Sequence, residues 1–209
     1  MDQSSNSVNQ LDILKELGNI GAGMAATALS KLVNKKINMT VPIAKLVNIN
    51  EMMELVGGPD LPVAAVFLKV EGELSGSLFF VLSLNDGTKL VKQLTNDETT
   101  NFELYEYDEF AISALQELGN IICAHYLTAL SNFTGLYVTQ SVPHVGIDMV
   151  GAIVTEGILE MSQDNDFVLF IDTQLEHSSQ SEIQKVKGHF FFIPHPESLE
   201  KISRSLGVK

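Results

Sequence analysis

Several residue types and patterns are scarce in this sequence, and each scarcity excludes a class of protein. A single cysteine, Cys123, excludes an internal disulfide and any metal site built from several cysteines. Only 13 Lys and Arg stand against 26 Asp and Glu, so the net charge of −13 disfavours nucleic acid and anionic lipid as partners. Apolar runs such as residues 63–68 are too short to cross a bilayer. Residues 1–10 are polar and lack the pattern of a signal peptide, so a cytoplasmic protein is expected.

What the chain does contain is an internal repeat. The pentapeptide Glu-Leu-Gly-Asn-Ile occurs at residues 16–20 and again at 117–121, an offset of 101. Pro42 and Pro143 keep the same offset, while Gly-Ser-Leu-Phe-Phe at 76–80 resembles Gly-His-Phe-Phe-Phe at 188–192 at an offset of 112. The sequence therefore predicts a duplication with about eleven extra residues in the second copy, located between Pro143 and the strand at 188–192.

The domain prediction follows from the repeat. A flexible tail is expected over residues 1–7, followed by a single domain over 8–209 that consists of two repeats, about 8–100 and 101–209. The chain is long enough, and at 45% apolar residues rich enough, to bury a core without disulfides or metals. A monomer is expected.

Each repeat shows the same order of hydrophobic patterns. These predict a long amphipathic helix, an extended stretch, a short helix, a pair of strands and a closing helix. The predicted ranges are 8–32, 37–47, 50–56, 63–70 with 76–82, and 86–94 in the first repeat, and 108–130, 136–143, 145–160, 167–173 with 188–193, and 196–206 in the second. Strands alternating with helices predict an α/β fold, an α+β sandwich with a continuous sheet, pseudo-twofold symmetry and the long motif-bearing helices on one face.

The repeated motif places a carboxylate and an amide on one face of a helix. Glu16 and Asn19, like Glu117 and Asn120, lie three positions apart, and Leu17 and Ile20 are expected to point toward the core. Gly18 lies between the polar pair although glycine costs roughly 1 kcal/mol in a helix interior. This loss of helix stability is explained if another group approaches the helix so closely that a side chain at this position would not fit. An exposed Glu or Asn is usually only solvated, but the duplication retains both polar residues while neighbouring positions differ.

The chemistry of this pair favours assistance to a reaction on a bound partner. An amide does not exchange protons, but it offers a donor and an acceptor that can hold a water molecule in line for attack. A carboxylate repels a phosphoryl group, so the Glu is better suited to grip a cation of the partner. The residues alone therefore indicate assisted hydrolysis on a bound partner and leave that partner open.

The two motif copies resemble the signature of the CheC/CheX/FliY family of chemotaxis phosphatases. That signature is Asp or Ser, three residues, Glu, two residues, Asn, then 22 residues and Pro. It is matched by Asp12, Glu16, Asn19 and Pro42, and again by Ser113, Glu117, Asn120 and Pro143. The resemblance covers nearly the whole chain. Two copies with no appended flagellar-switch domain resemble the CheC branch.

The resemblance implies an aspartyl-phosphate phosphatase that dephosphorylates the response regulator CheY. Asn19 and Asn120 would orient the attacking water, and Glu16 and Glu117 would pair with the regulator's active-site lysine. The family implies no cofactor of the chain's own, because Mg²⁺ is supplied by the bound regulator. It also implies a second partner, the deamidase CheD, whose binding enhances the phosphatase.

Alternative functions receive less support from the residues. Cys123 lacks the arginine of a Cys-x5-Arg phosphatase, since position 129 is Ala129, and its apolar neighbours favour a buried residue. The stretch 164–168 matches an Asp-x-Asp-x-Val phosphatase motif, but its apolar strand follows the aspartates instead of preceding them. The five histidines lack metal-ligand spacing, so no bound metal is expected. A module that sequesters a regulator or scaffolds CheD without chemistry remains the rival hypothesis.

The second repeat also carries a candidate surface for CheD. The segment 145–160 is predicted to be longer than its counterpart 43–57 and to hold a short helix. Its apolar residues either cover the sheet or form an exposed docking surface with Asp148 as a polar contact. These apolar residues are Ile147, Met149, Val150, Ile153 and Val154.

Overall fold

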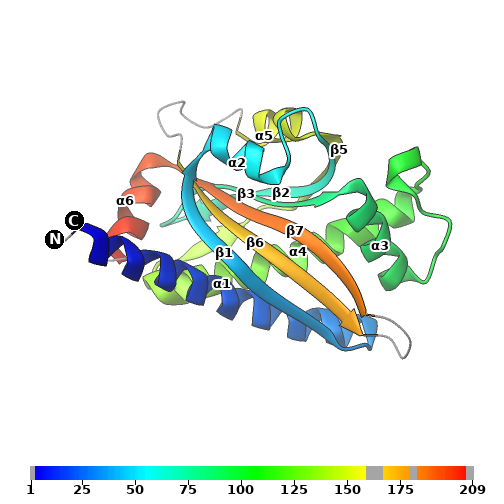
Figure 1. The fold of residues 1–209 in the computed structure, drawn as a ribbon, viewed down its shortest axis with the longest axis horizontal. Coiled ribbons are helices and arrows are strands. Elements are labelled where there is room, and N and C mark those ends of the chain that lie inside the picture. The colour runs from blue at the N-terminus through cyan, green and yellow to red at the C-terminus, as the bar shows by residue number, and fades with distance from the viewer. Residues whose placement is uncertain (1–2, 159–166, 179–182, 206–209) are drawn as a thin grey trace.

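One antiparallel sheet organises the protein. The computed structural model describes residues 3–158, 167–178 and 183–205 (Figure 1). Within them, seven strands form a sheet of order β1-β6-β7-β3-β2-β4, and β5 also pairs with β2. The strands are β1 (Ile37–Asn48), β2 (Pro62–Gly72), β3 (Gly76–Ser83), β4 (Val138–Gln140), β5 (His144–Met149), β6 (Phe167–Ser178) and β7 (Ile183–Pro194). The continuous sheet predicted from the sequence is confirmed.

The sheet interleaves the two halves of the chain. The hairpins β2–β3 and β6–β7 meet at its centre, where β3 pairs with β7. Each outer strand pairs with the hairpin of the other half, because β1 pairs with β6 while β4 and β5 pair with β2. No outer strand therefore pairs with the hairpin of its own half, and the hydrogen bonds of the sheet join the two halves into one body.

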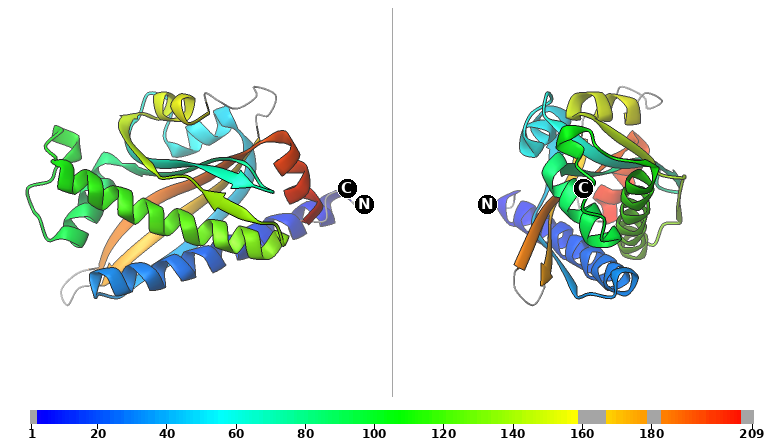
Figure 2. Two further views of the ribbon diagram at one scale, coloured as in Figure 1. Left: turned by 180° about the vertical axis from the view of Figure 1, so that it is seen from behind. Right: turned by 90° about the vertical axis from the view of Figure 1, so that its right-hand side faces the viewer.

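Helices cover both faces of the sheet and bury two apolar layers. The helices are α1 (Gln3–Val33), α2 (Ile49–Val56), α3 (Leu84–Thr95), α4 (Glu109–Thr134), α5 (Val150–Ile158) and α6 (Pro196–Ser205), with a short 3-10 turn η1 (Phe102–Leu104). The long helices α1 and α4 lie side by side on one face, and α2 and α5 lie on the other (Figure 2). No described helix is both long and apolar enough to cross a bilayer.

The central strands bury both of their faces. Successive residues of β3 point to opposite faces of the sheet, so that Phe79 enters one apolar layer and Phe80 enters the other. This explains the continuous apolar runs of β2 and β3, since a strand covered on both faces needs no polar alternation. Three helices, α2, α3 and α4, begin where the sequence supplies a cap. The side chains of Asn48, Ser83 and Asp108 each accept a bond from a backbone N–H three residues on.

The structure corrects two predicted boundaries. The backbone of α1 is already helical at Gln3, although a tail over residues 1–7 was expected. Residues 144–149 form strand β5, and only Val150–Ile158 is helical, whereas one helical segment was predicted over 145–160.

The structure also shows where between Pro143 and β7 the extra residues lie. The second part of β1, residues 43–48, and β5 at 144–149 keep the offset of 101, as do the starts of α2 and α5 at Ile49 and Val150. The longer strands β6 and β7 and the connection before β6 contain the additional residues. They therefore follow α5 and do not lengthen the segment directly after Pro143.

Candidate functional site: two Glu/Asn pairs beside strand irregularities

The first motif copy lies on the solvent side of α1 next to β1. Glu16 and Asn19 are both exposed. Asn19 Oδ1 accepts a hydrogen bond of 3.1 Å from the backbone N–H of Val41. Leu17 is buried as expected, but Ile20 is 51% exposed, so the expectation that it points into the core was wrong. The exposed surface of the first copy thus consists of a carboxylate, an anchored amide and an apolar side chain.

Pro42 explains why Val41 can bond to the motif. The pairing of β1 with β6 shifts register between Thr40 and Ile43, where two residues of β1 face one residue of β6. Proline has no N–H for the ladder and is tolerated on an edge strand at such a bulge. The bulge directs the Val41 N–H to α1 instead of to β6. The spacing of 22 residues between Asn and Pro therefore places the irregular point of the strand beside the amide.

The second copy lies in a hollow of about 530 Å³ between α4 and the β4–β5 edge. Its lining includes all four motif positions: Ser113, Glu117, Asn120 and Pro143. Asn120 Oδ1 accepts a 2.7 Å bond from Gln140 Nε2, and Gln116 Nε2 donates to the Pro143 carbonyl at 2.9 Å. The structure thus assembles the residues that the sequence pattern grouped. It adds Gln116 and Gln140, which sequence reasoning missed because no local pattern places a side chain across two elements.

In both copies one hydrogen bond fixes the amide and leaves it able to bind more. An amide oxygen has two lone pairs, and the NH2 group has two protons. Each Asn oxygen uses one lone pair within the protein, on Val41 in the first copy and on Gln140 in the second. The fixed amide can therefore still accept from or donate to a small polar molecule, while the exposed Glu16 and Glu117 remain free to meet a cation.

The motif glycines serve packing inside the protein. A Cβ on Gly119 would lie 2.5 Å from Val66 of β2, and one on Gly18 would lie 3.1 Å from Val41. A Cβ on Gly21 would lie 2.9 Å from the ring of Tyr126, where α1 crosses α4. The close approach predicted from these glycines is real, but the approaching groups are the sheet and the neighbouring helix. A Cβ on Gly23, by contrast, would meet no atom within 4 Å beyond the adjacent backbone of its own helix.

The alternative catalytic groups do not form sites in the described residues. Cys123 is fully buried, and desolvation raises the pKa of its thiol well above the usual range. Residues 164–166, the aspartate motif, lie outside the described part of the chain. His189 pairs with Asp172, with Nδ1 and Oδ1 3.1 Å apart. Within the described residues, no three His, Cys, Asp or Glu residues are grouped as metal ligands.

We expect Cys123→Ala to leave the assisted hydrolysis predicted from the Glu/Asn pairs at the wild-type rate, because a buried thiol with a raised pKa is not a nucleophile at neutral pH. The measurement is steady-state phosphate release, with thiol labelling at pH 8 as a check on burial. The native protein should resist labelling, and the denatured protein should take up one label. Loss of activity in a variant that is folded by circular dichroism would contradict this interpretation.

The apolar residues of the predicted CheD segment mostly cover the sheet. Val150, Ile153 and Val154 are buried in the layer beneath α5, so for these three residues the structure decides between the two alternatives in favour of covering the sheet. Asp148 and Met149 are exposed at the end of β5, where Asp148 Oδ1 accepts a 2.7 Å bond from the Met149 N–H. Any docking surface here is reduced to these exposed positions.

The sheet, the two long helices and the paired motifs define a class of duplicated α/β proteins that carry two Glu/Asn sites. The CheC-like family profile matches residues 10–46 and 110–147, which contain both motif copies. The chain is 42% identical over 199 residues to the CheY-P phosphatase CheC of Bacillus subtilis, covering 95% of this chain and 94% of that protein. The chain belongs to the CheC-like family.

More distant relatives share the fold. The flagellar motor switch phosphatase FliY of Bacillus subtilis is 26% identical over 134 residues, 64% of this chain and 34% of that protein. A crystal structure of Thermotoga maritima FliY superposes with a TM-score of 0.72 at 22% identity, covering 95% of this chain and 96% of that one. A CheX–CheY–BeF3–Mg complex from Borrelia burgdorferi superposes at 0.51 and 15% identity, covering 84% and 95%.

Proposed function

We propose that this protein is a phosphatase that dephosphorylates phosphorylated CheY, with one reaction site on each motif copy. The observation that carries the proposal is the same Glu/Asn pair, three positions apart, presented twice beside a proline at a strand irregularity: the register shift of β1 at Pro42 and the break between β4 and β5 at Pro143. Family membership supports it, because the Bacillus subtilis relative is a CheY-P phosphatase. We also propose that it works in the cytoplasm, which suits a chain with one buried cysteine.

The proposed chemistry is hydrolysis of an acyl phosphate on the regulator. A water oxygen forms a bond to phosphorus as the bond to the regulator's aspartate oxygen breaks, which yields inorganic phosphate and the free carboxylate. Asn19 or Asn120 would hold the water in line, because its amide is already fixed by one internal bond. The Mg²⁺ that neutralises the phosphoryl charge would be supplied by the regulator, so the chain needs no cofactor of its own.

The direct test is the decay of phosphorylated CheY with and without this protein. The regulator is charged with a small-molecule phosphodonor, and phosphate release is followed at steady state with Mg²⁺ present. The proposal requires catalytic turnover, with many regulator molecules dephosphorylated per molecule of this protein. Tight binding without faster decay would instead support the rival hypothesis of a binding-only module.

We expect the double variant Glu16→Gln with Glu117→Gln to raise KM about tenfold and to change kcat much less. Each Glu is exposed and is proposed to pair with the regulator's lysine, so its charge contributes to association. Salt should raise the wild-type KM more steeply than the KM of the variant, because screening weakens only the charged contact.

The control is Glu54→Gln, which removes an exposed charge from α2 on the opposite face of the sheet. Its kinetics should equal those of the wild type. A fall in kcat without a change in KM for the Glu16 and Glu117 variant would assign these carboxylates to the chemical step instead of docking.

We further propose that CheD binds at the exposed end of β5, with Asp148 as a polar contact and Met149 beside it. Asp148→Lys should weaken CheD binding while leaving the unassisted phosphatase rate unchanged, as measured by calorimetric titration and phosphate release. Glu54→Lys, a charge reversal on the first-half counterpart of α5, is the matched control. Undiminished CheD binding by both Asp148→Lys and Met149→Ser would place the surface elsewhere.

A further inference from the structure

An exposed apolar surface precedes the second motif along the chain. We define the aromatic flank as Leu104, Tyr105, Tyr107 and Phe110. Their exposed fractions run from 37% for Tyr107 to 64% for Leu104. Four large apolar side chains exposed within seven residues are unusual for a solvated loop, and such patches commonly mark interaction surfaces.

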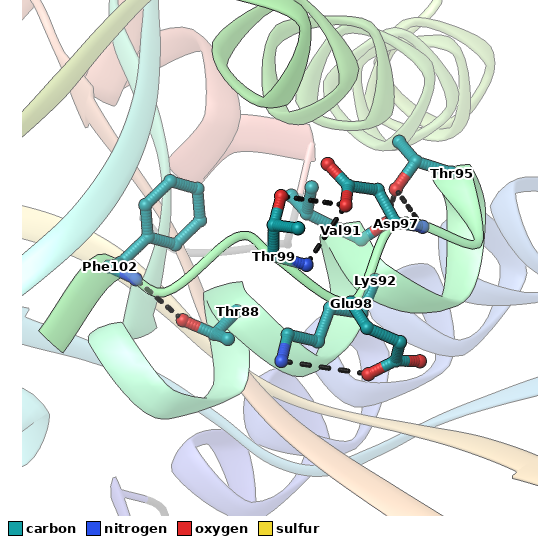
Figure 3. A network of polar contacts seen from close by, with 8 residues as sticks. All are labelled: Thr88, Val91, Lys92, Thr95, Asp97, Glu98, Thr99 and Phe102. Atoms are coloured by element: carbon teal, nitrogen blue, oxygen red, sulfur yellow. Dashed lines mark hydrogen bonds and ion pairs between the residues drawn. The ribbon is translucent and has the colours of Figure 1, made fainter. Parts of the chain in front are cut away.

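The backbone that presents the flank is tightly held. Phe102 is fully buried, and its N–H donates to Thr88 Oγ1 of α3 at 2.9 Å (Figure 3). Asn101 and Glu106 exchange two backbone hydrogen bonds, and the Asn101 side chain accepts from the N–H groups of Glu103 and Leu104. The flank is therefore exposed without being loosely attached, and a preorganised surface loses less entropy on binding.

The turn before this segment is also hydrogen-bonded. Asp97 Oδ1 accepts from both the backbone N–H and the hydroxyl of Thr99 (Figure 3). These bonds hold the pKa of the Asp97 carboxyl below its usual range. The segment between α3 and η1 thus has a hydrogen-bonded conformation, which helps to hold the flank in place.

One residue of the flank, Phe110, lies on the same face of α4 as the second motif. Phe110 precedes Glu117 by seven residues, or about two helical turns and roughly 10 Å, so both side chains leave α4 in nearly the same direction. The 3-10 turn η1 lies at the N-terminal end of α4 (Figure 2). On the strand side of the hollow, Val142 lines the wall and is 74% exposed. Apolar side chains thus border the polar pair on two sides.

The first repeat lacks this arrangement. At the offset of 101, the positions of Leu104, Tyr105, Tyr107 and Phe110 are occupied by polar residues, namely Gln3, Ser4, Asn6 and Asn9. The counterpart of Val142 is Val41, which is 2% exposed and part of the core. The first motif instead has Ile20 exposed, whereas its counterpart Ile121 is half-buried. The two motifs are therefore alike in their polar pair and different in their apolar surroundings.

We propose that the aromatic flank, together with Val142, is the docking surface for the phosphorylated response regulator at the second motif. The inference rests on the proposed function and adds which residues recruit the substrate and at which site. Aromatic side chains surrounded by polar groups are typical of binding hot spots. The flank is bordered by exposed Glu103, Glu106, Asp108 and Glu109, so the complementary partner surface is apolar with cations at its edge. The negative charge of these residues has the same sign as that of Glu117, which is proposed to meet the regulator's lysine.

The test uses a variant in which only the second site can act. In the Asn19→Ala background, Tyr105→Ser with Phe110→Asn replaces two flank residues by those of the first repeat. We expect KM for phosphorylated CheY to rise about tenfold, with kcat unchanged, because the lost contacts contribute to association and not to the chemical step. In the Asn120→Ala background, where only the first site acts, the same pair of substitutions should leave KM unchanged.

The matched control is Phe133→Asn with Tyr137→Ser in the Asn19→Ala background. These are exposed aromatics at the opposite end of α4, and Tyr137 at 65% is as exposed as Tyr105. Their kinetics should equal those of the parent. An unchanged KM for the flank variant would overturn the proposal, as would an equal rise in both backgrounds. Self-association that the flank substitutions abolish without affecting KM would show a dimer surface and would also overturn it. Absence of turnover in every background would refute the proposed function itself.

Discussion

The double variant Asn19→Ala with Asn120→Ala is expected to lose about a hundredfold or more in kcat while KM stays within about twofold. An amide that positions the attacking water acts mainly in the transition state, so its loss leaves the regulator bound but unreactive. Both amides are fixed by an internal hydrogen bond, to the Val41 N–H and to Gln140, so alanine removes an already oriented group. Phosphate release under steady-state conditions measures kcat and KM separately.

The single variants provide an internal check on the duplication. Asn19→Ala should retain the activity of the second site and Asn120→Ala that of the first. Their kcat/KM values should sum to the wild-type value, because each motif has its own helix and strand partners. Asn132→Ala, an exposed amide on α4 outside the hollow, is the matched control and should behave as wild type. Wild-type turnover by the double variant would remove both amides from the mechanism.

Gly119→Ala is expected to destabilise the protein by about 2 kcal/mol despite the better helix propensity of alanine. The new Cβ would lie 2.5 Å from both Val66 Cβ and Val66 Cγ2 in a central strand. Neither atom is the end of a flexible side chain, so α4 has to move away from the sheet. The thermal midpoint should fall by about 4–8 °C for a chain of this size, measured by calorimetry. The shift should also disturb the Asn120–Gln140 bond and lower second-site activity.

Gly23→Ala is the matched comparison, because nothing lies within 4 Å of a Cβ placed there. Alanine at this exposed helical position should stabilise the protein by about 0.5–1 kcal/mol. Gly18→Ala, with its Cβ 3.1 Å from Val41 Cγ1, should fall between the two. If all three substitutions shifted the thermal unfolding midpoint equally, packing would not explain why glycine occupies positions 18 and 119.

The order of elements and the position of the polar pair could be predicted from the sequence alone. Hydrophobic periodicity is a local property, and it located the long helices, the central hairpins and the closing helices to within a few residues. The repeat at an offset of 101 identified Glu16, Asn19, Glu117 and Asn120 because equivalent positions in two copies can be compared directly. Both pairs are on helices and reachable from solvent, as the spacing predicted.

Hydrophobic periodicity gave the wrong prediction where a strand passes directly into a helix and both have a similar composition. Residues 145–149 have a mostly apolar composition that suits either a helix or a strand, and pairing with β2 makes them part of strand β5. The same ambiguity left open whether Val150, Ile153 and Val154 cover the sheet or form an exposed face, and the structure buries them against the sheet.

What the sequence by itself determined is therefore the duplication, the fold class and the two polar pairs. Only the tertiary structure decided which partner fixes each amide, why glycine stands beside it, and which apolar residues are exposed around it. Val41 and Val142 occupy equivalent positions in the two repeats, yet one is buried in the core and the other borders a hollow. Strand register and long-range packing determine such differences. The pairing of β1 with β6 and of β4 and β5 with β2 joins residues far apart in the chain, and no local pattern encodes that pairing.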